Sequence, residues 1–532
     1  MSESLPLLNP LKKQSKKQSL SNSLVKKLLV FFTLAAIFIT IILQFLIIEP
    51  KQLQVERKKN FIFFVTDGTG PNYVTLTRNY KQFINNNDYA ELLQLDQHLS
   101  GTSRTRSNSS WVTDSAAGAT AFSCLLKTYN GAIGVDPHQN PCGTVLEAAK
   151  MANYLTGLVV TTRITDATPA SFSAHVDYRS QEDQIAEQQI SSGMVDLMIG
   201  GGLQHFVSGG RKDGRDIIKE LGSNWTTAND PASFFNVYNQ KNITESEVTL
   251  PFISLFEMGD VPFQIDVENM AYSGPSLKEE AELALRLLHS SPNNEKGFFL
   301  LIEGSRIDHC GHNNDAACIP RELIAFDEAF NYVKTFADEH PDEDFILFST
   351  SDHETGGMTI GRQITSDYPD YIWYPEVLAK VKHSGHYMAQ QLLTKNNVDE
   401  KFLKKTLFAD WLGIEDYTKE DIKQILSLIE SRNSGVLQDY INNMVGIRAR
   451  IGFSTHGHSA IDVNTYLHAN SESLLNYAFQ RVRGNRENTE FGSLVVEFLG
   501  LNMTAANEYA SGINHGPLFA STENIDEYHN NI

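Results

Sequence analysis

Five short runs of consecutive apolar residues recur along the chain, with helix-like patterns between them. The runs cover residues 61–67, 157–162, 196–201, 297–303 and 345–352. A run that is apolar on both faces is typical of a central strand in a covered parallel sheet. Residues 276–289 and 321–336 instead show the spacing of amphipathic helices. This alternation predicts an α/β fold with a central, mostly parallel sheet flanked by helices.

Three of the five runs end in a carboxylate. Asp67, Glu303 and Asp352 each stand at the end of a predicted strand. Because the carboxyl ends of parallel strands meet at one edge of a sheet, we expect these three side chains to converge there.

Residues 28–48 form a different kind of apolar segment, which has one Gln and no charged residue. As a helix these residues would be roughly 31 Å long, enough to cross a bilayer. A buried helix of a soluble protein is the alternative. The segment is longer than the apolar region of a signal peptide, and no small-residue cleavage site follows it. We therefore predict a retained transmembrane helix, with a cytoplasmic tail at 1–27 and a linker at 49–59.

Charge around this segment favours a cytoplasmic N-terminus. Basic residues before it are Lys12, Lys13, Lys16, Lys17, Lys26 and Lys27, and those after it are Lys51, Arg57, Lys58 and Lys59. This bias predicts a type II topology with a lumenal body. The glycosylation sequons at Asn108, Asn224, Asn242 and Asn502 all follow the segment, which agrees with that orientation. In the tail, Glu3 precedes Leu7 and Leu8 at the spacing of the acidic dileucine signals that cytosolic sorting adaptors bind.

The rest of the chain is large enough for one elaborated catalytic domain, predicted at 60–500. Residues 360–450 do not continue the alternation of strands and helices, and their composition predicts an inserted helical cap. Residues 501–532 are polar and predict a loop or a processed tail. The formal charge of -20 argues against nucleic acid as a partner. Four cysteines occur as two close pairs along the chain, Cys124/Cys142 and Cys310/Cys318. They lack zinc-knuckle spacing and are predicted to form disulfides in an oxidising compartment, and the sequence leaves open which cysteines pair.

Candidate chemistry begins with Asp114 and Ser115, which open a helix of small residues. Asp114 can be a plain helix N-cap, and from spacing alone this is the simpler interpretation. A serine at a helix N-terminus also lies in a field that favours an anion, and a phosphate there would be stabilised in the same way.

Further candidates follow along the chain. Residues 165–170 read Thr-Asp-Ala-Thr-Pro-Ala, and Arg179 comes soon after. Asp308 and His312 are four residues apart, a spacing that suits two ligands of one metal ion. Asp352 and His353 are adjacent at a strand end, and His456 and His458 lie far down the chain. Histidine is often a solvated or structural residue, and the chain has 16, so the argument rests on the whole set.

Together, these blocks resemble the alkaline phosphatase family from about residue 60 to residue 463, and with the anchor the chain is most similar to fungal vacuolar members. The blocks are Asp-Ser-Ala, Asp-Ala-Thr-Pro, Glu-x4-Asp-x3-His, Asp-His and His-x3-Asp-Val. The resemblance implies Ser115 as a nucleophile that becomes phosphoserine, Arg179 as a phosphate clamp and Asp114 as the residue that orients it. It implies a first zinc at Asp308, His312 and His458, a second zinc at Asp67, Asp352 and His353, and a magnesium at Asp67, Thr168 and Glu303.

Some positions stay open. His458 fits the spacing of the last block, and His456 is the alternative zinc ligand. Asp166 matches bacterial members whereas His309 matches animal ones, so the resemblance leaves open which of the two types of magnesium surroundings this chain has. The resemblance also implies broad specificity for phosphate monoesters, a homodimer and a place in the vacuole membrane.

Rival interpretations are a sulfatase, a phosphodiesterase or a phosphoglycerate mutase of the same superfamily, and a catalytically dead membrane scaffold. A sulfatase needs a Cys/Ser-x-Pro-x-Arg block, and Ser115 is followed by Ala-Ala-Gly. A diesterase is not expected to carry Thr168, Glu303 and Arg179 together. A dead scaffold would lack a ligand or the nucleophile, and each expected residue type is present in the sequence.

Overall fold

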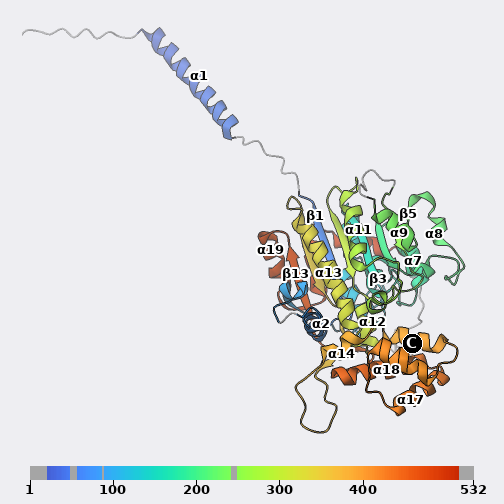
Figure 1. Ribbon diagram of the computed structural model, residues 1–532. Coiled ribbons are helices and arrows are strands. Elements are labelled where there is room, and N and C mark those ends of the chain that lie inside the picture. Colours follow the sequence, from blue (N-terminus) through green and yellow to red (C-terminus); the bar gives the residue numbers. More distant parts are fainter. Residues whose placement is uncertain (1–20, 48–56, 87–88, 241–247, 514–532) are drawn as a thin grey trace, which may run out of the picture. The chain divides into compact units, whose positions relative to one another are not determined.

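A computed structural model describes residues 21–47, 57–86, 89–240 and 248–513 (Figure 1). The chain divides into two units, Met1–Arg57 and Lys58–Ile532. In the first, α1 (Asn22–Ile47) begins ahead of the predicted start at residue 28. Its 26 residues make a helix roughly 39 Å long. Apolar side chains such as Phe31 and Phe32 are exposed, and an apolar helix of this length suggests a membrane anchor or a signal sequence.

The second unit is built on a ten-stranded sheet in the order β14-β2-β13-β8-β1-β7-β3-β4-β6-β5. Its strands are β1 (Lys59–Val65), β2 (Leu99–Arg104), β3 (Leu155–Arg163), β4 (Leu197–Gly201), β5 (Thr226–Thr227), β6 (Phe252–Leu255), β7 (Phe298–Glu303), β8 (Asp344–Thr350), β13 (Val463–Ala469) and β14 (Gly484–Glu487). All neighbours are parallel except β13, which runs antiparallel to both β2 and β8. The five predicted strands are confirmed as β1, β3, β4, β7 and β8, and the mostly parallel α/β fold with them.

Both faces of the sheet are covered, which explains why its central strands contain runs of consecutive apolar residues. Ile62 and Phe64 point into one core, and Phe61, Phe63 and Val65 into the other. The first core is covered by α2 (Pro71–Ile84), α3 (Gln94–Gln97), α9 (Pro231–Tyr238), α10 (Gln264–Val267), α11 (Leu277–Ser290) and α13 (Ile319–Asp338). The second is covered by α4 (Ser115–Cys124), α5 (Val145–Met151), α6 (Ala167–Ser173), α7 (Glu182–Ser191), α8 (Ile217–Glu220), α19 (Glu472–Val482), α20 (Thr489–Leu499) and α21 (Met503–Ala510). The short 3₁₀ turns η1 (Leu203–His205) and η2 (Gly222–Asn224) lie in the connections.

Two short hairpin-like pairs lie outside the main sheet. β9 (Glu354–Thr355) pairs with β12 (His458–Ser459), and β10 (Thr359–Ile360) pairs with β11 (Ile451–Gly452), both antiparallel. Between β10 and β11 the chain forms the cap, which consists of α14 (Pro375–Lys380), α15 (Gly385–Thr394), α16 (Glu400–Phe402), the π-helical η4 (Leu403–Leu412), α17 (Lys419–Ser431) and α18 (Ser434–Ala449). Figure 1 shows α14, α17 and α18 gathered at one end of the sheet, next to α12 (Arg306–His312).

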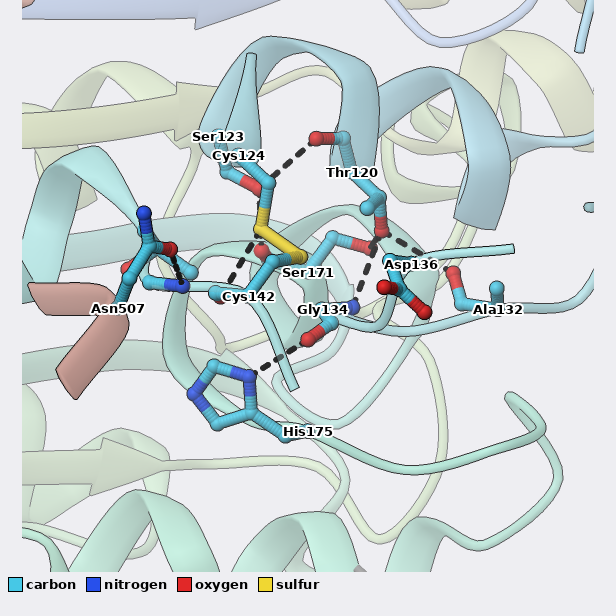
Figure 2. Close-up of a disulfide and its surroundings, with 12 residues drawn as sticks. Thr120, Ser123, Cys124, Ala132, Gly134, Asp136, Cys142, Ser171, His175 and Asn507 are labelled. Atoms are coloured by element: carbon cyan, nitrogen blue, oxygen red, sulfur yellow. Dashed lines mark hydrogen bonds between the residues drawn. A yellow bond between two sulfur atoms is a disulfide. The ribbon is translucent and has the colours of Figure 1, made fainter. Parts of the chain in front are cut away.

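The predicted disulfides are present, and they join Cys124 to Cys142 and Cys310 to Cys318, a pairing that the sequence leaves open. The first joins the end of α4 to the segment before α5 (Figure 2). In the same place Gly134 donates its backbone N–H to Thr120 of α4, over 3.1 Å, and its carbonyl contacts the His175 ring. The C-terminal end of the short helix α4 is thereby fixed.

The C-terminal tail differs from its prediction. Residues 503–510 form α21 rather than a loop, and Asn507 accepts a 2.8 Å hydrogen bond from the backbone N–H of Gly143. A Cβ on Gly143 would lie 2.3 Å from the Ala506 carbonyl carbon, so a glycine is needed for this close approach. Asn502, which the sequence marks only as a sequon, caps the helix through Ala505. Residues 514–532 lie outside the described part of the chain.

Candidate functional site

The carboxyl ends of the central strands bring three carboxylates together. Val65 of β1 is in register with Glu303 of β7 and with Thr350 of β8. Asp67 and Asp352 each follow two residues after these positions, so they lie at the same edge of the sheet as Glu303. Ligand-type atoms of Asp67, Asp352 and His353 all lie within 4.8 Å of one another.

Ser115 is the first residue of α4 and faces this group. Its Oγ lies 3.0 Å from Nε2 of His353, and its side chain is buried. The small residues of α4 allow the helix to approach the sheet edge, because a Cβ on Gly118 would lie only 3.0 Å from Cβ of Asp352. Ser115 is thus held at a helix N-terminus, a position that favours an anion.

Asp114 combines the two roles that the sequence leaves open. As the N-cap of α4 it accepts a 2.9 Å hydrogen bond from the backbone N–H of Ala117. Its other oxygen accepts from the backbone of Gly131 at 3.0 Å and from the Arg179 guanidinium at 3.2 Å. Arg179 also donates to Asp166 over 3.1 Å. The guanidinium is therefore held between two carboxylates, next to the nucleophile candidate.

A chain of histidines and one aspartate leads outward from Ser115. The His353 and His458 rings stack with centroids 3.5 Å apart, and His458 Nε2 lies 3.1 Å from His312 Nε2. Asp308 lies 3.2 Å from His312. Asp308, His353 and His458 form a second group whose ligand-type atoms are within 4.8 Å of one another.

The pairing of β9 with β12 places His458 in this group. Thr355 of β9 lies opposite His458, two residues after His353. His458 Nδ1 contacts the Thr113 carbonyl at 2.7 Å, which leaves Nε2 facing the group. His456 is oriented differently: its Nδ1 contacts the His312 carbonyl at 2.8 Å, and its side chain is 55% exposed. The structure brings His458, and not the His456 ring, to the cluster.

Several buried oxygens in the cluster are consistent with bound cations. Among the residues that the structure describes, Asp67 Oδ1, Asp352 Oδ2 and Thr168 Oγ1 have no hydrogen-bond partner. Burial and the nearby carboxylates raise the pKa of Asp67 well above its usual value, and burial and Asp308 raise that of Asp352 to about 7. Packed anions with unpaired oxygens are costly unless positive charge balances them. The donor set of carboxylates, imidazoles and a hydroxyl fits divalent metal ions.

Glu303 and Thr168 form the part of the cluster without histidine. Both are buried, and burial raises the pKa of Glu303 to about 8. Ser305 donates to Glu303 over 2.5 Å. Together with Asp67, these residues offer oxygen atoms only, the ligand type that Mg²⁺ prefers.

Asp166 and His309 have different bonded partners in the structure. Asp166 accepts from Arg179 and lies 3.3 Å from Arg163. Burial by itself would raise the pKa of Asp166, but the charges of Arg163 and Arg179 hold this pKa below its usual value. His309 Nδ1 instead lies 2.8 Å from the Arg306 guanidinium. Asp166 is therefore an anchor for arginines in this arrangement.

This geometry agrees with what comparison with known proteins shows. The model of the family described as "Alkaline phosphatase" matches residues 58–501. This chain belongs to the alkaline phosphatase family. It is accordingly a metal-dependent hydrolase, and phosphate monoesters are the expected substrates of its family.

Similar proteins support the same assignment over most of the chain. The repressible alkaline phosphatase of Saccharomyces cerevisiae is 48% identical over 90% of this chain and 88% of its own length. The alkaline phosphatase of Schizosaccharomyces pombe is 40% identical over 85% and 83%, respectively. The crystal structure of Thermus thermophilus alkaline phosphatase superposes with a TM-score of 0.72 at 27% identity, over 85% of this chain and 95% of that one.

Two residues of this alkaline phosphatase site are absent from the sequence prediction. Thr355 donates its hydroxyl to Asp308 and lies 3.2 Å from His353 Nδ1, so it fixes both side chains. Its place two residues after His353 is the only signal in the sequence. Arg163, at the end of β3, binds Glu182 and Asp260 at 2.7 Å each, besides Asp166. An arginine at a strand end has too many other uses to be identified from sequence alone.

Proposed function

We propose that the protein hydrolyses a broad range of phosphate monoesters through a phosphoserine at Ser115. The observation that carries this proposal is the position of Ser115: a buried hydroxyl at a helix N-terminus, 3.0 Å from His353, between the anchored Arg179 and the carboxylate cluster. Neither the sulfatase nor the diesterase alternative accounts for this combination with Thr168 and Glu303.

Three divalent cations fit the donors. Asp308, His312 and His458 would hold one zinc, Asp67, Asp352 and His353 a second, and Asp67, Thr168 and Glu303 a magnesium. When bound, such ions neutralise the phosphate dianion and the charge that develops on the attacking and leaving oxygens. Buried oxygens of Asp67, Asp352 and Thr168 that have no hydrogen-bond partner support this assignment.

The chain's own residues supply the nucleophile and the phosphate grip. Ser115 loses its hydroxyl proton and its Oγ bonds to phosphorus while the ester P–O bond breaks; the alkoxide leaves on the opposite side and takes up a proton from water to give the alcohol. Water then breaks the phosphoserine bond and releases inorganic phosphate. The Arg179 fork matches two phosphate oxygens, and Asp114 and Asp166 keep it in place through both steps.

For location, we propose a single-pass type II protein of the vacuole membrane whose catalytic unit is lumenal and glycosylated. The charge bias around the apolar segment and the two disulfides support this orientation. Asn108, Asn224 and Asn502 are exposed, as glycosylation requires. Asn242 and the dileucine motif at Glu3, Leu7 and Leu8 lie outside the described residues. A cytosolic sorting adaptor and a homodimer remain proposals that rest on the motif and on the family.

Replacement of the nucleophile tests the proposal. Ser115→Ala should lower turnover of p-nitrophenyl phosphate by about 10³-fold or more, with thermal unfolding unchanged. Acid quenching with labelled substrate should leave covalent phosphate on the Ser115 peptide of the unaltered protein only. The exposed Ser473→Ala is the matched control. Full turnover by Ser115→Ala, or chelator-insensitive turnover by the unaltered protein, would contradict the mechanism.

A further inference from the structure

A cavity of about 370 Å³ lies where the cap meets the segments that carry Asn314 and His456, each two residues from a histidine of the metal-ligand cluster. Its walls come from α17 and α18 of the cap, from β11, and from the segments that carry Asn314 and His456. Tyr440 and Phe453 give it aromatic surface, and Arg362 and Asp439 give it charge. Its volume is within the usual range for a small-molecule site.

The cavity adjoins the side of the catalytic site that opens to solvent. Exposure increases outward from the nucleophile. Ser115 and His353 are buried, with 3% and 0% of their surfaces exposed. The exposed fraction of the side chain is 9% for His458, 37% for His312 and 55% for His456. The alcohol of a substrate attacked by Ser115 leaves on the side away from the nucleophile. It therefore emerges past His312, where His456 forms both the rim of the site and a wall of the cavity.

Arg362 gives this cavity a specific chemistry. Its stem lies over Gly452, with Cγ and Cδ 3.2 and 3.1 Å from where a Cβ would be, and its guanidinium passes Gly446. One guanidinium nitrogen donates to Asn443 over 2.9 Å. Within the described part of the chain, Arg362 forms no ion pair. Asp439, the carboxylate in the same wall, lies 3.7 Å from His456 instead.

We propose that this cavity binds the alcohol portion of the substrate and that Arg362 selects alcohols that carry an anionic group. This proposal rests on the proposed function, because it needs a monoester held at Ser115. An arginine that is already positioned by Asn443 loses little conformational freedom when it pairs with a carboxylate. Tyr440 and Phe453 favour a planar alcohol, so a phenol with a carboxylate is the simplest probe.

The test compares two substrates of equal shape and different charge. They are 4-carboxyphenyl phosphate and the neutral 4-carbamoylphenyl phosphate, together with the corresponding 3-substituted pair. In Arg362→Gln, kcat/KM for at least one carboxylate should fall about tenfold relative to its amide partner. Arg362→Lys should give an intermediate ratio. Inherent differences in leaving-group reactivity cancel, since each ratio is compared between variant and unaltered protein.

Two controls distinguish a subsite from a structural role. Arg432→Gln, on the exposed end of α17, should leave every ratio unchanged. Inhibition by inorganic phosphate should be the same in Arg362→Gln, because that ion binds at Arg179. An equal fall for acid and amide, or no fall beyond about twofold, would overturn the proposal. Failure of the unaltered protein to hydrolyse any of these esters would instead overturn the proposed function.

Discussion

Two histidines separated by one residue show how the surroundings of a side chain determine its role. His458 directs Nε2 toward Asp308 and His312, because its Nδ1 is engaged by the Thr113 carbonyl. His456 is exposed, and its Nε2 faces Asn314 at 3.3 Å and Asp439 at 3.7 Å. A metal-ligand imidazole generally has its second nitrogen fixed by such a hydrogen bond.

Metal analysis of the two variants tests this distinction. His458→Ala should lose about one equivalent of zinc per chain after dialysis, whereas His456→Ala should keep the content of the unaltered protein. Elemental analysis of purified protein measures both. Equal zinc content in the two variants would contradict the assignment of His458, and loss in His456→Ala alone would reverse it.

At the level of elements, α4 depends on contacts that fix its far end. His175, between α6 and α7, contacts Glu147 of α5 at 2.8 Å through Nε2. Its Nδ1 contacts the Gly134 carbonyl at 2.7 Å (Figure 2). Protonated histidine donates from both nitrogens, which suits two acceptors. Burial alone would lower the pKa of His175. The carboxylate of Glu147 outweighs burial, and the pKa of His175 is raised above its usual value.

The raised pKa predicts a pH-dependent contribution to stability. The folded protein keeps a proton on His175 at a pH where the unfolded chain has lost it, so the contribution is complete below about pH 6.5. It is lost as the pH rises through the folded value. The difference in melting temperature between the unaltered protein and His175→Gln should therefore be larger at pH 6 than at pH 9. A difference that grows with pH would contradict this account.

Elements also differ in how well they follow from sequence. The five predicted strands begin and end within three residues of the observed bounds of β1, β3, β4, β7 and β8. They are recognisable because a strand buried on both faces carries consecutive apolar side chains. α11 begins after Ser276, whose capping box with Glu279 is local. β13 and α21 carry no comparable pattern. β13 is an antiparallel strand between β8 and β2, and α21 is short and is held by contacts with α5.

For the whole molecule, the catalytic unit is complete without the N-terminal segment. β1 begins at Lys59 and pairs on both sides, with β7 and β8. The two cores on either side of the sheet are formed by residues after Arg57. The first unit, by contrast, exposes apolar side chains along α1.

Removal of residues 1–57 tests this independence. The shortened chain should stay in solution without detergent, melt within about 2 °C of the complete protein, and keep its kcat/KM for p-nitrophenyl phosphate. Membrane association should be lost. The complete chain in detergent is the control, and aggregation or inactivity of the shortened chain would show that the anchor is needed for folding.

Local sequence determined the five central strands β1, β3, β4, β7 and β8, the helices near residues 276–289 and 321–336, the apolar segment and the residue types of the site, because each depends on neighbours a few positions away. It also placed Asp67, Glu303 and Asp352 at strand ends, from which their convergence follows. The tertiary structure alone decided the rest. The β9–β12 pair brought His458 to the cluster, Arg163 paired with Asp260, and Arg362 came to line the same cavity as His456. These contacts join residues about 100 positions apart or occur where several side chains were equally suitable, so they depend on packing rather than on any local pattern.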